Sequence, residues 1–384
     1  MIYNFDEVRP RRTTESYKWH AYPEDVLPLF VADMDFISPQ PVVDALRERV
    51  DHGIFGYPKE MPEFRPVLLK WMEEQYGWKV DPDSIILMPG VVTAFNLACQ
   101  AFGKPGEGVL VQPPVYPPFL SAAQYAGMTR QDAQLSRSID GNYEIDYDAF
   151  EAAIKPETRI FILCNPHNPV GRVFRRNELE KMAEICLRHN LLIVSDEIHC
   201  DLIFTGYRHT AISSLSPEVA DRTITLFAPS KTFNIAGLEC SIAVIPNPVL
   251  RKQFNEAKRG VVGWVNLMGQ VAALAAYRDG REWLEQTLGY LEKNRDYLTT
   301  YLKNELPTIT LPRIEGTYLA WLDCRNTGIK GNPSEFFIKN AKVALNDGST
   351  FGVGGDGFVR LNFGCPRSIL AQALERMKSA LREL

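Results

Sequence analysis

A lysine that could act as a nucleophile and a carboxylate that could bind a cation each follow an apolar segment of this chain. Lys231 comes four residues after the apolar run 223–227, in a loop of mostly small or apolar residues. Burial there would lower the pKa of its amine and make the amine nucleophilic. Asp196 directly follows the run 191–195, where a carboxylate is costly unless it meets a cationic group. A single lysine is usually an exposed surface residue, so this interpretation depends on the neighbouring loops.

Three further loops, each after another short apolar run, carry groups that would bind a planar, phosphorylated ligand. Gly90 makes a turn before a helical pattern, so the free N–H groups of Val91 and Val92 would bind a phosphate. Tyr116 lies in a proline-rich loop and would stack on a planar ring. Asn168 lies in a loop with two Asn–Pro steps and would present a fixed amide. Taken singly, an ordinary turn and a surface tyrosine explain the first two loops equally well.

Together, the five loops match the needs of one cofactor. Pyridoxal phosphate needs a lysine for a Schiff base, an acid at its pyridinium nitrogen, a phosphate site and a stacking ring. Ligands of open α/β sheets bind at the carboxyl ends of the strands, where all these groups would lie. The sequence therefore predicts a pyridoxal phosphate site, in which Asp196 keeps the ring nitrogen protonated.

Short apolar runs alternating with helix-length patterns must position these groups. The runs are rich in β-branched residues and are bounded by Gly, Pro, Asn or Asp; they cover residues 84–88, 108–112, 159–164, 191–195, 223–227 and 241–245. Such alternation predicts a mainly parallel sheet with helices on both faces. Between the runs, residues 93–101 and 178–190 have helical patterns.

The second half of the chain has a different pattern. A long helical region covers residues 248–306, and strands are then predicted at 316–323 and 357–363, with a helix at 366–384. We therefore expect an α/β protein with a large cofactor-binding domain at 46–280, whose mainly parallel sheet is sandwiched by helices. A smaller α+β domain is expected from both termini, at residues 1–45 and 281–384.

Composition and charge exclude several other classes of protein. The 384 residues are 45% hydrophobic and 23% charged, with a net charge of −5 and no basic block, so neither disorder nor nucleic-acid binding is expected. No run approaches the roughly 20 apolar residues of a membrane span. Seven scattered cysteines without a C-x-x-C pair predict buried thiols rather than disulfides or zinc. We expect a cytoplasmic protein that does not bind membranes.

The loops, taken in order, resemble the fold-type-I pyridoxal-phosphate enzymes of the aminotransferase class I/II superfamily. The resemblance is strongest to the cystathionine β-lyase (cysteine C–S lyase) branch. It rests on Gly90-Val91-Val92, Tyr116, Asn168 within residues 165–171 (NPHNPVG), residues 196–199 (DEIH) and residues 230–237 (SKTFNIAG), together with residues 31–36 (VADMDF), 55–57 (FGY) and 351–366. The sequences DMDF and TFNIAG favour the lyase branch.

The resemblance implies a role for each matching residue at the cofactor. Lys231 would form the Schiff base, Asp196 would bind the pyridinium nitrogen, and Tyr116 would stack on the ring. Asn168 would bind the phenolic oxygen. The phosphate would be met by the amides of Val91 and Val92 and by Ser230.

Two further matches imply a substrate clamp and a partner subunit. Arg360 resembles the arginine that clamps the substrate α-carboxylate, where a bidentate guanidinium suits the geometry; Asn168 and Tyr116 would lie beside that substrate. Tyr57 resembles the tyrosine that crosses to the phosphate of a neighbouring subunit. A homodimer with shared active sites is therefore implied.

Three positions depart from the pattern of aminotransferases. His199 stands where a tyrosine is usual. It is assigned to the cofactor site, but it lacks the hydroxyl that a tyrosine would direct to the cofactor oxygen. Val170 replaces a threonine. Glu239 replaces an arginine that neutralises the phosphate, so we expect Glu239 to turn away, or the phosphate to rely on amides and Tyr57.

The expected reaction is an α,β-elimination of L-cystathionine or a related S-substituted cysteine to thiol, pyruvate and ammonia. The alternative is an aminotransferase on the same scaffold, and a third possibility is a non-catalytic pyridoxal-phosphate-binding regulator. Near the N-terminus, the aromatic residues Tyr17, Trp19, Tyr22 and Phe36 either line the substrate pocket or pack in the core. Arg11 and Arg12 are predicted to be a surface or interface pair.

Overall fold

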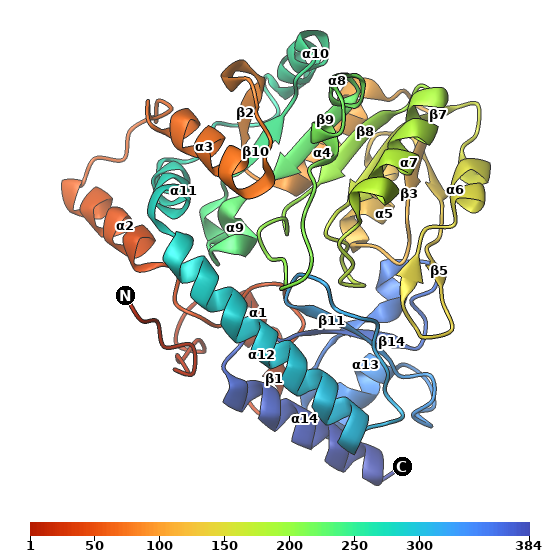
Figure 1. Ribbon diagram of the computed structural model, residues 1–384. Coiled ribbons are helices and arrows are strands. Elements are labelled where there is room, and N and C mark those ends of the chain that lie inside the picture. The colour runs from red at the N-terminus through yellow and green to blue at the C-terminus, as the bar shows by residue number, and fades with distance from the viewer.

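A seven-stranded sheet forms the centre of the computed structural model, which describes all 384 residues (Figure 1). The strand order is β2-β10-β9-β8-β7-β3-β4, and all strands are parallel except β10, which is antiparallel to both of its neighbours. The strands are β2 (Ile85–Met88), β3 (Gly108–Val111), β4 (Thr129–Asp132), β7 (Thr158–Cys164), β8 (Leu192–Asp196), β9 (Thr223–Phe227) and β10 (Ser241–Val244). All six predicted strands are confirmed. The edge strand β4 escaped prediction because its polar, half-exposed residues show no apolar run.

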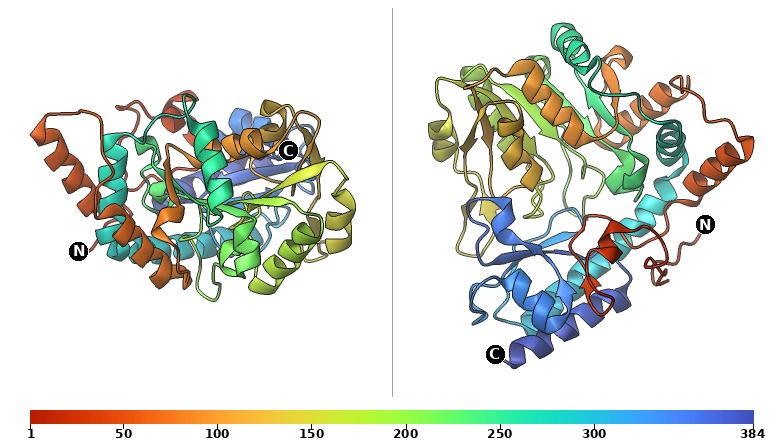
Figure 2. Two further views of the ribbon diagram at one scale, coloured as in Figure 1. Left: turned by 90° about the horizontal axis from the view of Figure 1, so that it is seen from above. Right: turned by 180° about the vertical axis from the view of Figure 1, so that it is seen from behind.

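Alternate residues of each strand face opposite layers of helices. In β7, Ile160 and Ile162 pack with α4, α5 and α10, whereas Phe161 and Leu163 pack with α6 and α7. This period of two follows from the pleat of a β-strand, and it explains why the strands are apolar throughout. The covering helices, visible on either side of the sheet in Figure 2, are α4 (Val91–Phe102), α5 (Pro117–Tyr125), α6 (Tyr147–Ala153), α7 (Arg176–Arg188), α8 (Pro217–Asp221) and α10 (Pro248–Lys258).

A second region follows the sheet and includes the C-terminus. The predicted helical stretch consists of α10, α11 (Leu267–Asp279) and α12 (Arg281–Glu305), and α12 runs from the sheet region toward the C-terminal helix α14 (Arg367–Arg382) (Figure 1). The predicted strands are present as β11 (Leu319–Asp323) and β14 (Phe358–Asn362), which pair with β13 (Asn346–Asp347) in the order β11-β14-β13. The remaining elements here are α13 (Pro333–Phe336), the π-helical turn Phe337–Ala341 and β12 (Val343–Ala344).

The N-terminal segment joins this second region. β1 (Leu27–Pro28) pairs in parallel with β12, and the short helix α1 (Tyr17–His20) precedes it. Two longer helices, α2 (Gln40–His52) and α3 (Phe64–Tyr76), then lead to the sheet, and β5 (Ser136–Arg137) pairs with β6 (Tyr143–Glu144) beyond it. The pairing of β1 with β12 fits a small domain built from both termini, but its boundaries at residues 45 and 281 stay a prediction.

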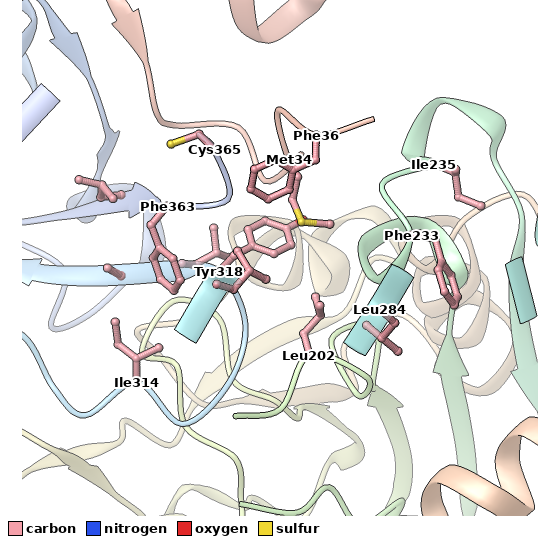
Figure 3. Close-up of a cluster of buried hydrophobic side chains, with 14 of the residues drawn as sticks. Met34, Phe36, Leu202, Phe233, Ile235, Leu284, Ile314, Tyr318, Phe363 and Cys365 are labelled. Atoms are coloured by element: carbon pink, nitrogen blue, oxygen red, sulfur yellow. The ribbon is translucent and has the colours of Figure 1, made fainter. Parts of the chain in front are cut away.

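One apolar cluster connects the sheet to both chain ends. Figure 3 shows side chains from the N-terminal segment, the loop after β9, α12 and the second region converging on it; they include Met34, Phe36, Phe233, Ile235, Leu284, Tyr318 and Phe363. All seven cysteines are buried and unpaired, as predicted. None of the helices combines the length and the apolar character that a membrane crossing requires.

Candidate active site

A cavity of about 430 Å³ lies at the carboxyl ends of the central strands. Its wall is completed by residues from the N-terminal segment and by β14 of the second region. Nine of the ten predicted site residues line it: Val91, Val92, Tyr116, Asn168, Asp196, His199, Ser230, Lys231 and Arg360. The structure therefore brings together groups that are up to 269 positions apart in the sequence, from Val91 to Arg360.

Lys231 lies on the short helix α9 (Pro229–Thr232), directly after β9. Its Nζ donates a hydrogen bond to the carbonyl oxygen of Ala32 at 2.7 Å. Burial lowers the pKa of the amine to about 8, although the charges of Asp33 and Asp196 act in the opposite direction and those of Arg360 in the same one. The protonated form still predominates near physiological pH, but the neutral, nucleophilic fraction of this lysine is far larger than that of an ordinary lysine.

Asp196 is the last residue of β8 and is almost completely buried. One of its carboxylate oxygens, Oδ1, accepts a hydrogen bond from the backbone N–H of Ile198 at 3.0 Å, and the carboxylate has no arginine or lysine within ion-pair distance. Burial raises its pKa to about 7, and the Ile198 hydrogen bond and the charge of Lys231 oppose this effect. A buried carboxylate with spare acceptor capacity fits a protonated ring nitrogen of a ligand.

Arg360 is a buried cation without an acidic partner. Its Nη1 donates to Asn168 Oδ1 at 3.0 Å, and its Nη2 donates to the carbonyl of Phe30 at 2.9 Å and to Asn346 Oδ1 at 2.6 Å. The Nε has no partner, and burial lowers the pKa of the guanidinium to about 10. An uncompensated buried charge is costly, so this arrangement fits the binding of an anionic group.

The start of α4 carries the backbone N–H groups for which the sequence predicted an anion site. Gly90 is the N-cap of this 12-residue helix and contributes no side chain, and the position its Cβ would take has no atom within 4 Å. The N–H groups of the first helical turn, which include those of Val91 and Val92, have no partner within the helix and lie at the positive end of the helix dipole. Ser230 and Ser241 line the same cavity.

His199 and Tyr116 complete the inner wall. His199 is 3% exposed, its Nδ1 has no hydrogen-bond partner, and its ring meets that of Tyr318 edge-on at 6.0 Å. Burial and, to a smaller extent, the charges of Lys231 and Arg360 lower the pKa of His199 to about 3, so the imidazole is neutral. Burial also raises the pKa of Tyr116, which keeps its hydroxyl protonated.

Tyr57 is the one predicted site residue that lies outside the cavity. It is 94% exposed and packs edge-on against Trp264, with 5.8 Å between the ring centroids. Its predicted role requires a second subunit, so its position in one chain does not test that role. Glu239 lies on the cavity wall, with a left-handed backbone (φ 51°) and no ion-pair partner.

Sequence reasoning missed the backbone carbonyl groups that the N-terminal segment supplies to the site. The carbonyl oxygens of Phe30 and Ala32 bind Arg360 and Lys231, and Tyr318 also donates to Ala32 at 2.9 Å. Because backbone carbonyls make these contacts, residue type carries no signal for them. The one available sign that this segment belongs to the site was the presence of residues 31–36 (VADMDF) among the motifs that carry the family resemblance.

A buried ion cluster holds this segment in place. Lys18 is 1% exposed, and its Nζ lies 2.7 Å from Asp35 and 3.5 Å from Asp33. Arg11 binds the same two carboxylates at 2.6 and 2.8 Å, and Trp19 donates to Asp35 at 2.9 Å. Burial would lower the pKa of Lys18, but the charges of Asp35 and Asp33 outweigh it and raise the pKa.

The structure revises the prediction for Arg11 and Arg12 and decides between the two alternatives for the N-terminal aromatic residues. Arg11 is a partly buried member of the ion cluster rather than a free surface residue, and Arg12 donates to several carbonyls of the segment, including that of Val26 at 3.0 Å. Of the four aromatic residues weighed for the pocket, Tyr17 alone lines the cavity. Trp19 binds the cluster, Phe36 is part of the apolar core, and Tyr22 packs on Phe30.

The cavity residues fit pyridoxal phosphate. They offer a lysine with a lowered pKa, a buried acid with spare acceptor capacity, free helix N-terminal amides beside open space, and an aromatic ring. This donor set corresponds to the aldehyde, the ring nitrogen, the phosphate and the ring face of that cofactor.

Comparisons with known proteins agree with this chemistry. A family described as "Aminotransferase class I and II" matches residues 24–377. The chain is 43% identical to cystathionine β-lyase PatB of Bacillus subtilis, over 98% of this chain and 100% of that protein. It is 33% identical to a cystathionine β-lyase of Corynebacterium glutamicum, again over 98% and 100%.

A solved structure gives the same result in three dimensions. Cystalysin from Treponema denticola, whose crystal structure contains pyridoxal 5′-phosphate, superposes with a TM-score of 0.96 at 35% identity, over 100% of both chains. Two relatives described as aminotransferases are more distant, at 28% identity.

Proposed function

This chain belongs to the aminotransferase class I and II family, and we propose that it acts on L-cystathionine or related S-substituted L-cysteines. It is a pyridoxal-phosphate-dependent C–S lyase of the cystathionine β-lyase type. The reaction consumes water and converts the substrate into a thiol, pyruvate and ammonia. The observation that carries the substrate class is Arg360, a buried guanidinium in the same cavity as Lys231 and without an acid of its own.

In this proposal, the cavity divides between cofactor and substrate. Lys231 would bind the aldehyde carbon of the cofactor, Asp196 the ring nitrogen and Tyr116 the ring face. Asn168 and His199 would bind the ring substituents, and the amides of Val91 and Val92 with the hydroxyl of Ser230 would bind the phosphate. When bound, pyridoxal phosphate withdraws electrons from the substrate α-carbon.

The residues of the chain then perform the proton and binding steps. Arg360 binds the α-carboxylate through charge-assisted hydrogen bonds and orients the α-carbon toward Lys231. The lowered pKa of Lys231 lets its Nζ accept the α-proton near neutral pH. The C–S bond electrons leave with the sulfur, which departs as a thiolate and takes up a proton.

We also propose that the enzyme is a cytoplasmic homodimer in which Tyr57 reaches the phosphate of the partner's site. Support comes from the exposed aromatic and aliphatic side chains around it, since Ile54, Phe55 and Trp264 are all more than half exposed. A patch of this kind on one chain is typical of an interface. The unpaired thiols support a reducing compartment.

The test is the release of thiol and pyruvate from L-cystathionine by the holoenzyme, with no keto acid added. We expect equal amounts of both products, and no pyruvate without added keto acid from L-alanine, a control substrate that has the same α-carbon but no leaving group. The competing activity is amino transfer on the same scaffold. Transfer that requires a keto acid, with no thiol released, would contradict the proposal.

A further inference from the structure

A buried hydrogen-bond cluster lies outside the cavity, around the carboxylate of Asp201. This residue is 8% exposed, does not line the cavity and has no lysine or arginine within ion-pair distance. Its Oδ1 accepts a hydrogen bond from Trp71 Nε1 at 3.1 Å and another from the hydroxyl of Tyr76. Its Oδ2 accepts one from Thr232 Oγ1 at 2.8 Å. Three donors thus satisfy a buried carboxylate, and the proposed chemistry uses none of them.

The helix that carries Lys231 is too short to hold its own position. α9 has four residues, and its turn is closed by a hydrogen bond from the N–H of Phe233 to the carbonyl of Pro229 at 2.8 Å. A single helical turn is unstable by itself, because several backbone angles are fixed for very few hydrogen bonds. The position of Lys231 therefore depends on contacts that its neighbours make with the rest of the protein.

Thr232, the next residue in the chain, supplies such a contact. Lys231 lines the cavity, whereas Thr232 is completely buried and does not line it. The hydroxyl of Thr232 joins α9 to Asp201, and Asp201 is joined in turn to α3 through Trp71. The ring of Phe233 also packs edge-on against that of Trp71, with 5.7 Å between the centroids. The two residues that follow Lys231 are therefore both anchored on α3.

Asp201 also belongs to the loop that carries two predicted cofactor ligands. Asp196 ends β8, and His199 follows on the cavity wall, two residues before Asp201. The hydrogen bond between Thr232 and Asp201 therefore connects the loop of Asp196 to the helix of Lys231. In the proposed function these two groups would bind opposite ends of one pyridine ring, so the distance between them must be fixed.

We propose that Asp201 is a positioning residue for Lys231 and acts through the hydroxyl of Thr232. This inference rests on the proposed function, in which Lys231 accepts the α-proton, and adds two residues that determine where its amine lies. The charges that shift the pKa of Lys231 belong to other residues, so Asp201 acts through geometry. Geometry matters here because a displacement of about 1 Å can reduce a rate about a hundredfold.

Thr232→Val tests this role, because it removes the hydroxyl and keeps the β-branched shape. With L-cystathionine as substrate of the holoenzyme, we expect kcat to fall about tenfold and KM to stay within about twofold, since Arg360 still binds the substrate. The rate at which the apoenzyme binds pyridoxal phosphate, followed by absorbance, should also fall about tenfold. Thr232→Ser retains the hydroxyl and should restore both values to within about twofold of the wild type.

Thr223→Val is the matched control for a purely structural effect. Thr223 is completely buried at the start of β9, the strand that leads to α9, and its hydroxyl donates to the carbonyl of Val219 at 2.7 Å. Both Thr→Val substitutions remove one buried hydrogen bond, so both should lower the free energy of unfolding in chemical denaturation to a similar extent. Thr223→Val should nevertheless leave kcat and the rate of cofactor binding within about twofold of the wild type.

Asp201→Asn separates geometry from charge. The amide can keep its oxygen toward Trp71 and Tyr76 and turn its nitrogen toward Thr232, whose hydroxyl accepts as well as donates hydrogen bonds. We therefore expect kcat to stay within about threefold of the wild type. A much larger loss in Asp201→Asn than in Thr232→Val would show that Asp201 acts through its charge, and would overturn the inference.

Two other results would also overturn it. One is a Thr232→Val variant with the kcat and the cofactor-binding rate of the wild type, and the other is a Thr223→Val variant with losses as large as those of Thr232→Val. Failure of the proposed function has a different signature. The wild type would then release no pyruvate from L-cystathionine, and the rates of cofactor binding alone would decide whether Thr232 and Asp201 position Lys231.

Discussion

The cavity has two walls that are built in different ways. The inner wall consists of residues at the carboxyl ends of β2, β3, β7, β8 and β9, each at the end of a buried strand or a few residues after it. The outer wall consists of the N-terminal segment around Ala32, which contacts Lys231 and Arg360 through backbone carbonyls. The inner wall contributes specific side chains to the site. The outer wall contributes backbone carbonyl groups, so its contribution depends on the position of its backbone.

The outer wall depends on contacts from several parts of the chain. Asn234, three residues after the active-site lysine, binds the backbone of Met34 and Phe36 through both ends of its amide. Asn362 donates to the carbonyls of Val31 and Asp33 at 2.6 Å. The ion cluster of Lys18 and Arg11 with Asp33 and Asp35 closes the remaining side. A segment without regular secondary structure is thereby fixed against the lysine and the carboxylate clamp.

The largest expected effect concerns the inner wall. Lys231→Ala should reduce turnover by at least about ten thousand-fold, because both the attachment of the cofactor and the proton transfer are lost. The cofactor that the protein retains after gel filtration, measured by absorbance, should fall as well. Lys258→Ala is the control, since Lys258 is half-buried with a pKa lowered by burial, but donates to the carbonyl of Leu87 outside the cavity. Equal losses in both variants would contradict the role assigned to Lys231.

The next largest effect concerns the ion cluster of the outer wall. Lys18→Met leaves Asp35 buried beside one cation instead of two, so we expect the free energy of unfolding to fall by about 3 kcal/mol in chemical denaturation. Lys70→Met removes an exposed ion pair with Glu74 and should cause no measurable change. If Lys18→Met is as stable as the wild type, the cluster does not hold the segment.

The smallest effect connects the two walls through the pKa of Lys231. The neutral amine attacks the cofactor aldehyde, so the rate at which the apoenzyme binds pyridoxal phosphate should rise with pH, with a midpoint of about 8. The charge of Asp33 favours the protonated amine. Asp33→Asn should therefore move the midpoint to lower pH, by less than about one pH unit.

Asp25→Asn is the control for this measurement. Asp25 lies on the same N-terminal segment, but it pairs with Lys342 at the surface and does not line the cavity. Its substitution should leave the midpoint where it is in the wild type. A midpoint that moves to higher pH in Asp33→Asn would contradict the prediction that the charge of Asp33 raises the pKa of Lys231.

The sequence by itself determined the inner wall. Each of its groups follows a short run of apolar residues, and such runs report a buried strand because every side chain of a covered parallel sheet is buried. Because ligands of such sheets bind at the carboxyl ends of the strands, the order of the runs alone places Lys231, Asp196, Asn168 and Tyr116 in one cavity. The order of these motifs also indicated the family.

The tertiary structure decided everything that depends on backbone groups and on distant partners. Nothing in the residue type of Ala32 shows that its carbonyl meets Lys231, because every residue has a carbonyl. The pairing of Lys18 with Asp35, and the choice of Tyr17 over Tyr22 as the ring that faces the cavity, follow from how the N-terminal segment pairs with β12 and binds Asn362 of β14. The local sequence pattern predicts burial and secondary structure. Contacts between distant segments depend on how those segments pack, so only the folded structure shows them.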